Sequence, residues 1–204
     1  MSVSRRRLAE RLSLILSAPT VAVIAVVIFS CLSPIGLGPF LGVGISILFG
    51  TLFLAILPVA PVLYYAQKGE VDIDVSDRRK RPKLFGMAIL GYCLGVLAFG
   101  LLSATSLMVL SLAYVGVTSS ILLVSLSWKI SVHTAAIAGP VTGLTYVFGW
   151  IAALIYLLLL PVGWARLKLK VHTFSQVSTG TVLAILVTFV VYVLFYPVPP
   201  RPWF

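Results

Sequence analysis

The segment WARLKLKVHTFSQ, residues 164–176, places three cations and a histidine close together in the chain. It follows residues 134–165, which contain no Asp, Glu, Lys or Arg. The planar fork of Arg166 suits two oxygens of a phosphate, and the imidazole of His172 can act as a nucleophile. The residue types therefore allow phosphate chemistry, but a basic stretch beside an apolar one also marks the edge of a membrane span.

Two further polar clusters precede this segment. DIDVSDRRKRPK occupies residues 72–83, and KISVH occupies residues 129–133. Each alone is typical of a solvated loop or of a basic membrane flank. His133, with an unperturbed pKa of about 6.5, is suited to give a proton to a leaving group and to take one from water. Together the clusters supply cations, a nucleophile and an acid, which hydrolysis of a phosphate ester requires.

The elements that hold these clusters are expected to be membrane helices. Of the 204 residues, 60% are apolar and 10% are charged, and the mean hydropathy is +1.13. These values are typical of integral membrane proteins. Lipid cannot satisfy open backbone groups, and the sequence lacks the alternation of barrel strands. We therefore expect an all-α fold, a polytopic transmembrane bundle of six or seven helices that forms a single integral membrane domain over residues 1–204.

The lengths of the apolar stretches set the number of crossings. Residues 84–128 would extend roughly 65 Å as one helix at about 1.5 Å per residue, about twice the bilayer core. We therefore expect a hairpin that turns near Ser103 to Ser106, and by the same reasoning a second hairpin that turns at residues 148–150. The expected crossings are residues 13–33, 41–65, 84–102, 106–127, 132–148, 150–166 and 173–196.

This order of crossings places nearly all positive charge on one face. Fourteen of the fifteen Lys and Arg residues lie on the side of the N-terminus, and only Arg201 lies opposite. The positive-inside rule makes that side cytoplasmic. We therefore expect an integral protein, of the cell membrane, whose loops 66–83, 129–133 and 166–176 meet at the cytoplasmic face.

Charge and composition also argue against several classes of protein. Cations spread over membrane loops without an aromatic platform do not indicate a nucleic-acid partner. Every Asp, Glu, Lys and Arg lies outside the apolar spans, which disfavours a proton- or ion-coupled transporter. The net charge of +10 favours contact with the anionic headgroups of the bilayer. These patterns do not encode an oligomeric state.

The third cluster resembles a phosphatase motif. Residues 165–176 read A-R-x-x-x-x-x-H-x-x-x-Q, which is similar to the SRxxxxxHxxxD motif of the type 2 phosphatidic acid phosphatase superfamily. ISVH, residues 130–133, stands where that family has PSGH, and Arg81-Pro82 stands where it has the end of KxxxxxxRP. The order of the three motifs agrees, and the resemblance covers roughly residues 66–185.

The resemblance implies a metal-independent hydrolase without a cofactor. His172 would attack phosphorus and form a phosphohistidine, and His133 would protonate the leaving oxygen and then deprotonate water. Gln176 would orient His172 through its amide oxygen. The other implied site residues would bind the phosphate of the substrate: Arg166, Ser131, Arg81, Arg78 and Lys129.

Four positions depart from the family's pattern. Gln176 replaces the aspartate that orients the nucleophile, so it would stabilise an imidazolium less than a carboxylate does. Ala165 replaces a serine, Val132 replaces a glycine, and Asp74 stands at the position of the motif lysine. Lys129 is the candidate to replace that lysine.

The expected function is hydrolysis of a phosphate or diphosphate monoester of a lipid, either a polyprenyl diphosphate or a phospholipid-head phosphate. One alternative is a Mg²⁺-dependent membrane prenyl- or phosphotransferase that uses Asp72, Asp74 and Asp77. No acid follows Asp77, so the second acidic cluster that such enzymes need is missing. The other alternative is a non-catalytic membrane protein that binds lipid phosphates.

Overall fold

The computed structural model describes residues 3–197, and within this range the chain is helical without a strand. A π segment, Leu52–Ile56, joins α3 to α4, and 3-10 segments at Arg78–Lys80 and Leu154–Leu158 precede α5 and α9. The expected all-α fold is confirmed. The α-helices are α1 (Val3–Ile15), α2 (Ala18–Leu32), α3 (Val43–Thr51), α4 (Leu57–Gln67), α5 (Arg81–Leu101), α6 (Thr105–Ser125), α7 (Val132–Phe148), α8 (Trp150–Ala153), α9 (Leu159–Lys168) and α10 (Phe174–Phe195).

Five helical stretches are long and apolar enough to cross a membrane, and the bent pair α1–α2 is a possible sixth span. The remaining predicted crossing, residues 132–148, coincides with α7, whose 17 residues extend about 25 Å. The apolar helices indicate an integral membrane protein. The five stretches are residues 43–67, 78–101, 105–125, 150–168 and 174–195.

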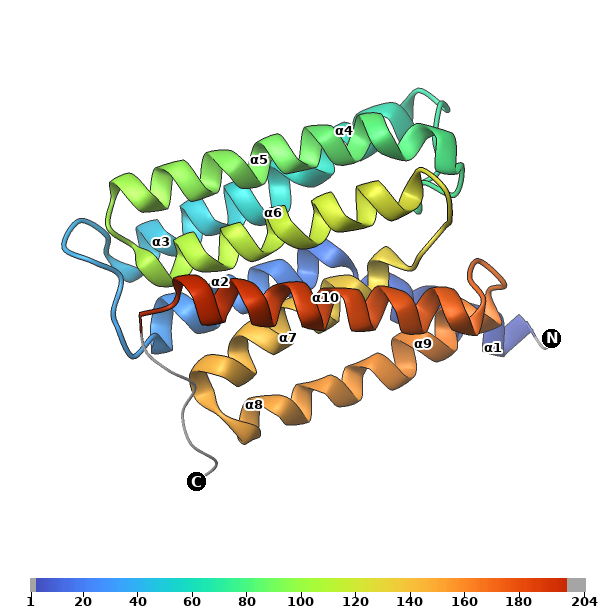
Figure 1. The fold of residues 1–204 in the computed structure, drawn as a ribbon. Helices are drawn as coiled ribbons and strands as arrows, with labels where there is room; N and C mark the ends of the chain where they lie inside the picture. The colour runs from blue at the N-terminus through green and yellow to red at the C-terminus, as the bar shows by residue number, and fades with distance from the viewer. Residues whose placement is uncertain (1–2, 198–204) are drawn as a thin grey trace.

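The central helix is α7, which packs against α10 and α2 (Figure 1). Most of its side chains are buried. The approach of α10 is close, because a Cβ added at Gly143 would lie 2.6 Å from the hydroxyl of Tyr192. The first turn of α7 carries His133, so this packing fixes the height of His133 relative to α10.

Both predicted hairpins are present. Residues 102–104 join α5 to α6, and the two helices pack side by side along their length (Figure 1). α7 ends at Phe148, and Gly149, whose φ is 79°, leads into α8. Glycine reaches such a left-handed conformation without steric cost. The two hairpins bring the starts of α5, α7 and α10 to the same end of the bundle.

The first crossing differs from the prediction of one helix over residues 13–33. α1 ends at Ile15, α2 begins at Ala18, and the two meet at an angle of 43°. Ser17 is the extended N-cap of α2, and Pro19 lies in its first turn, where a missing N–H breaks no helical hydrogen bond. The arginine-rich start of the chain therefore forms a helix of its own, packed on α9.

The second crossing contains a π segment. It widens the otherwise continuous helix of residues 43–67 and contacts α2. Pro58 and Pro61 follow in α4, and neither has a backbone N–H to donate to the preceding turn. The local break in the α-helical pattern is therefore consistent with the positions of the two prolines, and π segments are frequent at functional sites.

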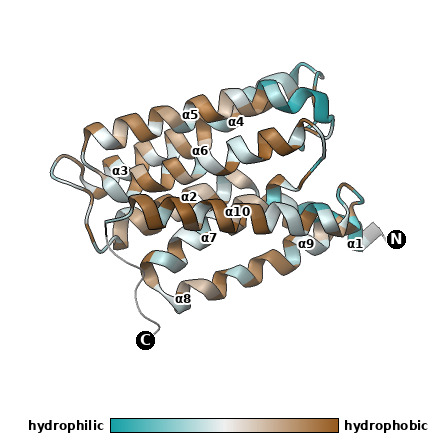
Figure 2. Cartoon of the chain, in the orientation of Figure 1, coloured by the Kyte–Doolittle hydropathy of each residue, from teal (hydrophilic) through white to brown (hydrophobic). Residues whose placement is uncertain are grey.

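Hydrophilic residues gather at one end of the bundle, where α1 begins and where α4–α5 and α9–α10 are connected (Figure 2). The helices between the two ends are apolar on their outer faces. Arg201, which was predicted on the opposite face, lies outside the described residues. This polar end contains the three clusters, residues 72–83, 129–133 and 164–176, for which the sequence predicts phosphate chemistry.

Candidate active site

Asp74 connects the three clusters at the polar end. Its Oδ2 lies 3.0 Å from Nη2 of Arg166, in the last turn of α9. Its Oδ1 lies 3.8 Å from Nε2 of His133, in the first turn of α7. One carboxylate therefore joins the α4–α5 loop to a histidine and an arginine that are distant in the sequence.

Arg166 is almost fully buried, with 2% of its surface exposed. Besides contacting Asp74, it donates from Nη1 to the hydroxyl of Ser13 in α1, at 3.3 Å. Its Nε has no hydrogen-bond partner among the described residues. A buried guanidinium with an unused donor is destabilising. A guanidinium fork of this kind can bind two phosphate oxygens, but here Ser13 and Asp74 are the partners of Nη1 and Nη2, and only Nε is unused.

Gln176 fixes the orientation of His172. Its Oε1 accepts the backbone N–H of Thr173 at 3.1 Å and lies 3.2 Å from Nδ1 of His172. Because a backbone N–H only donates, the atom that faces it is the amide oxygen, and Nδ1 of His172 must carry the hydrogen. Nε2 then has a free lone pair, as a nucleophile requires. Thr173 and Gln176 also form the capping box that starts α10.

Burial keeps His172 neutral. Only 7% of the residue is exposed, and desolvation is the main reason that its pKa falls from 6.5 to about 4. The positive charges of Lys129 and Arg166 lower the pKa further, and the hydrogen bond to Gln176 opposes them. At neutral pH the imidazole is therefore uncharged, and its lone pair is available.

Arg81 joins two of the loops and is itself buried, with 1% of its surface exposed. Its Nε donates to the carbonyl of Val75 at 3.0 Å, and its Nη1 donates to the carbonyl of Ile130 at 3.1 Å. Val75 has a positive φ of 46°, an outlier for a β-branched residue. Arg81 therefore holds the loop that carries Asp74 in a strained conformation against the start of α7.

Ser131 links the starts of α7 and α10. Its hydroxyl accepts the backbone N–H of Thr134 at 3.4 Å, as the N-cap of α7. Its own backbone N–H donates to the carbonyl of Gln176 at 3.0 Å. Because that N–H is already used, these contacts do not support the predicted phosphate-binding role of Ser131. Its position instead sets the spacing between the two helices that carry the histidines.

Lys129 and Arg78 have different surroundings. Desolvation lowers the pKa of Lys129, and the charges of Arg81 and Arg166 lower it further, so Lys129 belongs to the cationic group of the site. Arg78 donates from Nη1 to the carbonyl of Leu126 at 3.1 Å, just after α6. The guanidinium of Arg78 therefore caps a helix, and its position does not support the predicted contact with phosphate.

The acids of the α4–α5 loop have separate partners. Asp72 accepts the backbone N–H and the hydroxyl of Ser76, both at 2.8 Å. Asp77 accepts the backbone N–H of Arg79 at 3.0 Å and starts the 3-10 segment. Asp74 pairs with the arginine of α9. Among residues 3–197 no three His, Cys, Asp or Glu side chains are placed to share a metal ion.

A cavity of about 720 Å³ opens beside the Asp74 carboxylate. His133, Arg166 and two further acids, Glu10 and Asp72, line it, together with apolar residues of α1 and α4 that include Leu14 and Leu63. His172 is not among its lining residues. The cavity therefore gives access to Arg166 and His133, whereas His172 lies outside its lining.

No protein-family model, no curated protein and no solved structure matches this chain. The resemblance to the phosphatase superfamily rests on the motif residues. Six of the eight predicted site residues share one electrostatic and hydrogen-bonded neighbourhood, while Ser131 and Arg78 serve as helix caps. The six are His172, His133, Gln176, Arg166, Arg81 and Lys129.

Sequence reasoning missed the contacts of Asp74 and of Ser13. The motif comparison treated Asp74 as a lysine lost from the pattern, whereas the structure makes it the partner of Arg166. Ser13 was expected at the start of the first crossing, and it contacts Arg166 because α1 folds back onto α9. Only the Ser17 and Pro19 signal for a helix start indicated that break in the chain.

Proposed function

We propose that the protein hydrolyses a phosphate or diphosphate monoester of a lipid through a phosphohistidine intermediate. The observation that carries the proposal is the state of His172, whose Nδ1 is held by Gln176 and whose lowered pKa leaves Nε2 unprotonated at neutral pH. Such a histidine beside buried cations has the parts of a nucleophilic phosphatase site. The apolar surroundings favour a substrate whose tail stays in the bilayer.

The reaction has two steps. Nε2 of His172 attacks phosphorus, the bond from phosphorus to the lipid oxygen breaks, and that oxygen takes a proton from the imidazolium form of His133, which becomes neutral. His133 then takes a proton from water, whose oxygen attacks phosphorus and breaks the bond to His172. The products are a lipid alcohol, or a monophosphate if the substrate is a diphosphate, and inorganic phosphate. Arg166 would neutralise the phosphoryl oxygens in both transition states.

Asp74 gives this mechanism an extra requirement. Its carboxylate lies at Nη2 of Arg166, where a phosphate oxygen would bind. Two anions cannot share that position without strong repulsion, so an incoming phosphate must displace Asp74. The strained conformation at Val75 favours such a movement of the loop, because leaving it releases strain.

The two alternative functions have less support. A Mg²⁺-dependent transferase would need the carboxylates of Asp72, Asp74 and Asp77 around one ion, and each has a partner of its own. A non-catalytic lipid-phosphate binder would have no use for the fixed tautomer of His172. Turnover in excess EDTA separates the hydrolase from the transferase, because the histidine mechanism uses no metal.

We also propose that the site faces the cytoplasm of a cell membrane, because the positive-inside rule applies to the end that carries the site. Cysteines introduced at Ser76 and Lys170, after replacement of Cys31 and Cys93, test this in intact cells. An impermeant thiol reagent should label neither. Labelling of both from outside would reverse the orientation, and labelling of one alone would contradict a composite site.

The experiment that tests the proposed function is a phosphate-release screen of the purified protein. Farnesyl diphosphate and dioctanoyl phosphatidic acid are the two probes, each with and without EDTA. Wild type should release phosphate from at least one probe, and His172→Ala should not. Lys168→Ala, an exposed cation four residues earlier, is the matched control and should keep full turnover. Release by His172→Ala at the wild-type rate would remove the proposed nucleophile.

A further inference from the structure

α2 packs against the continuous helix of α3, the π segment and α4 (Figure 1). Residues of these elements line an apolar groove. Its volume is about 430 Å³, and its lining residues are uncharged. Ala55, in the π segment, forms part of the lining and is 4% exposed, while Ala60 is exposed on α4. These small side chains leave the groove open toward the lipid.

The groove adjoins the cavity of the candidate active site. Leu63 of α4 lines both, so the two hollows are neighbours at this residue. From Leu63 the cavity extends to Arg166 and His133, and the groove extends in the other direction to Thr51. Thr51 and Leu63 are separated by about 18 Å at about 1.5 Å per residue, which is more than half of the hydrocarbon core of about 30 Å.

We propose that this groove binds the hydrocarbon tail of the lipid phosphate while its head occupies the site cavity. The inference rests on the proposed function, because it concerns the substrate of that same site. The path divides into two parts: ionisable residues line the cavity, with the buried Arg166 among the acids Glu10, Asp72 and Asp74, and only uncharged residues line the groove. The lipid would enter sideways from the bilayer, and its tail would not leave the apolar phase.

The polar groups of the groove are consistent with this occupant. Thr20 of α2 lines the groove, and its hydroxyl is hydrogen-bonded to the hydroxyl of Ser17 at 3.0 Å. The hydroxyl of Thr20 therefore keeps a hydrogen-bond partner within the protein when a hydrocarbon chain lies beside it. Ser17 lines the site cavity, so this pair stands at the point where head and tail would join.

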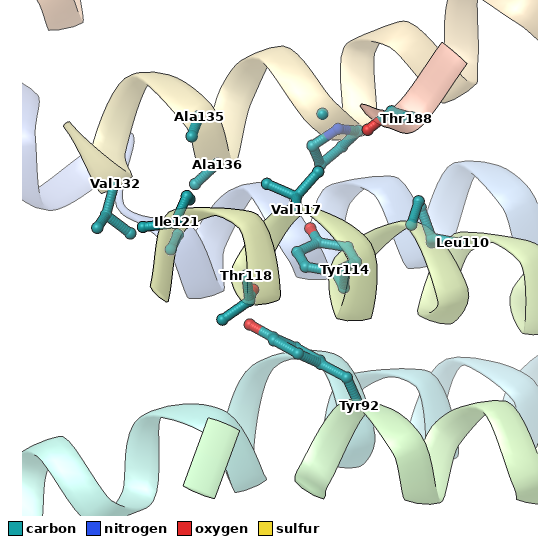
Figure 3. Close-up of a pocket in the computed structure, with 14 residues that line it drawn as sticks. Tyr92, Leu110, Tyr114, Val117, Thr118, Ile121, Val132, Ala135, Ala136 and Thr188 are labelled. Carbon is teal, nitrogen blue, oxygen red and sulfur yellow. The ribbon is translucent and has the colours of Figure 1, made fainter. Parts of the chain in front are cut away.

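Two other apolar hollows fit a tail less well. The cavity in Figure 3 lies among α5, α6, α7 and α10, where Tyr92 and Tyr114 point between the helices, and its volume is about 50 Å³. An apolar cavity that holds benzene measures about 150 Å³, so this one is too small for a chain. A groove along α10 has a volume of about 430 Å³, but none of its lining residues lines the site cavity.

The test compares probes that share a head and differ in tail. Farnesyl diphosphate is paired with isopentenyl diphosphate, and dioctanoyl phosphatidic acid is paired with glycerol 3-phosphate. Ala60→Trp should fill the groove and lower kcat/KM for the long-tailed probe at least tenfold, because apolar burial of the tail is lost. Turnover of the short-tailed partner should stay unchanged. Thr20→Phe narrows the groove from α2 and should act in the same direction.

Val182→Trp is the matched control, since Val182 is lipid-facing and lines the groove of equal volume along α10. Val182→Trp should leave kcat/KM unchanged for both the long-tailed and the short-tailed probe. Unchanged turnover of the long-tailed probe by Ala60→Trp and Thr20→Phe would overturn the inference, and so would equal losses for both tails or an equal loss in Val182→Trp. Failure of wild type to hydrolyse any probe would instead refute the proposed function. If Ala60→Trp lowers turnover of farnesyl diphosphate, the tail is a prenyl chain; if it lowers turnover of dioctanoyl phosphatidic acid, the tail is an acyl chain.

Discussion

At both ends of the helical bundle the chain turns between helices, but the connections at the two ends contain different types of residue. At the end away from the site, the connections α2–α3, α5–α6 and α7–α8 contain no ionisable residue. At the site end, the connections α4–α5, α6–α7 and α9–α10 contain acids, cations and His172. A membrane hairpin can therefore form without ionisable residues, whereas the end with the candidate site contains many of them.

Among the described residues, the hydrogen bonds at the far end join hydroxyl and backbone groups. The hydroxyls of Ser33 and Ser106 are hydrogen-bonded between the start of α6 and the end of α2. The backbone N–H of Ala104 donates to the carbonyl of Phe99 at 2.8 Å and closes the α5–α6 turn. Neutral contacts are therefore enough to join these helices.

The site end buries charge that topology does not require. The positive-inside rule is satisfied by exposed cations such as Arg5 and Arg6. Arg81 and Arg166, in contrast, are 1% and 2% exposed, and burial of a guanidinium costs several kcal/mol unless it is well paired. The difference between the ends is what the proposed phosphate site would require, because buried cations there would have a role in addition to the fold.

Replacing Arg166 should produce the largest difference between the ends. Lys cannot form two parallel hydrogen bonds to a phosphate, so Arg166→Lys should lower turnover by about a hundredfold or more. Ser33→Ala at the far end should reduce stability by about 1 kcal/mol and leave turnover intact. Phosphate-release rates and thermal unfolding of both variants are the measurements. Normal turnover in Arg166→Lys would show that the buried charge of Arg166 serves only the fold.

Replacing Gln176 should give the next largest loss of turnover, because Gln176 acts by orienting His172. Gln176→Leu removes the acceptor of the Nδ1 proton and should lower turnover by roughly tenfold or more. Gln176→Glu keeps an oxygen at the same reach and should retain turnover, with a pH profile shifted upward because a carboxylate favours the imidazolium. Thr173→Ala removes the capping contact on the same helix end and should affect stability alone. Equal rates in all three variants would show that Gln176 serves only as a cap.

Replacing Asp74 should have a smaller effect than replacing Gln176, and it should strengthen phosphate binding rather than weaken the site. Asp74→Asn removes the anion that competes for Arg166, so inorganic phosphate should inhibit turnover at roughly threefold to tenfold lower concentration. Asp77→Asn, in the same loop but facing Arg79, is the control and should leave inhibition unchanged. Weaker phosphate binding in Asp74→Asn would mean that the carboxylate assists the site.

The last expected effect is on stability as a function of pH. The pKa of His172 is lowered in the folded state to about 4, so between pH 6.5 and 4 the unfolded chain binds the proton more readily. Stability should therefore fall as the pH falls through this range, by at most about 1.4 kcal/mol per pH unit from this one group. Thermal unfolding in detergent should show a shallower pH dependence in His172→Asn. Identical dependence in both proteins would contradict a buried neutral histidine.

Much of the fold was predictable, because the bilayer fixes how long an apolar stretch must be before it turns. The hairpin near Ser103 and the turn at Gly149 follow from that length alone. The convergence of His133, Arg166 and His172 at one end then follows from counting the crossings. The break between α1 and α2 was missed, although Ser17 and Pro19 marked it.

The contacts inside the site could not be read from the sequence. Spacing placed Asp74 in a loop, but its approach to Arg166 depends on the positive φ of Val75 and on the pairing of Arg81 with two carbonyls. Motif comparison also assigned Ser131 and Arg78 to phosphate, and it did not predict their contacts at helix ends, where Ser131 accepts the N–H of Thr134 and Arg78 donates to the carbonyl of Leu126. Motif spacing predicts which segments meet, whereas local backbone geometry decides which side chain turns inward.

The central claim is that His172 is a nucleophile, and capture of its phosphorylated form tests this most directly. His133→Asn should slow hydrolysis of the intermediate, so this variant is incubated with a ³²P-labelled lipid phosphate and quenched in alkali, in which phosphohistidine survives. Peptide mapping should place the label on residue 172, and the double variant with His172→Ala should carry none. Label that persists in the double variant, or its absence from a His133→Asn protein that still binds the substrate, would contradict the account.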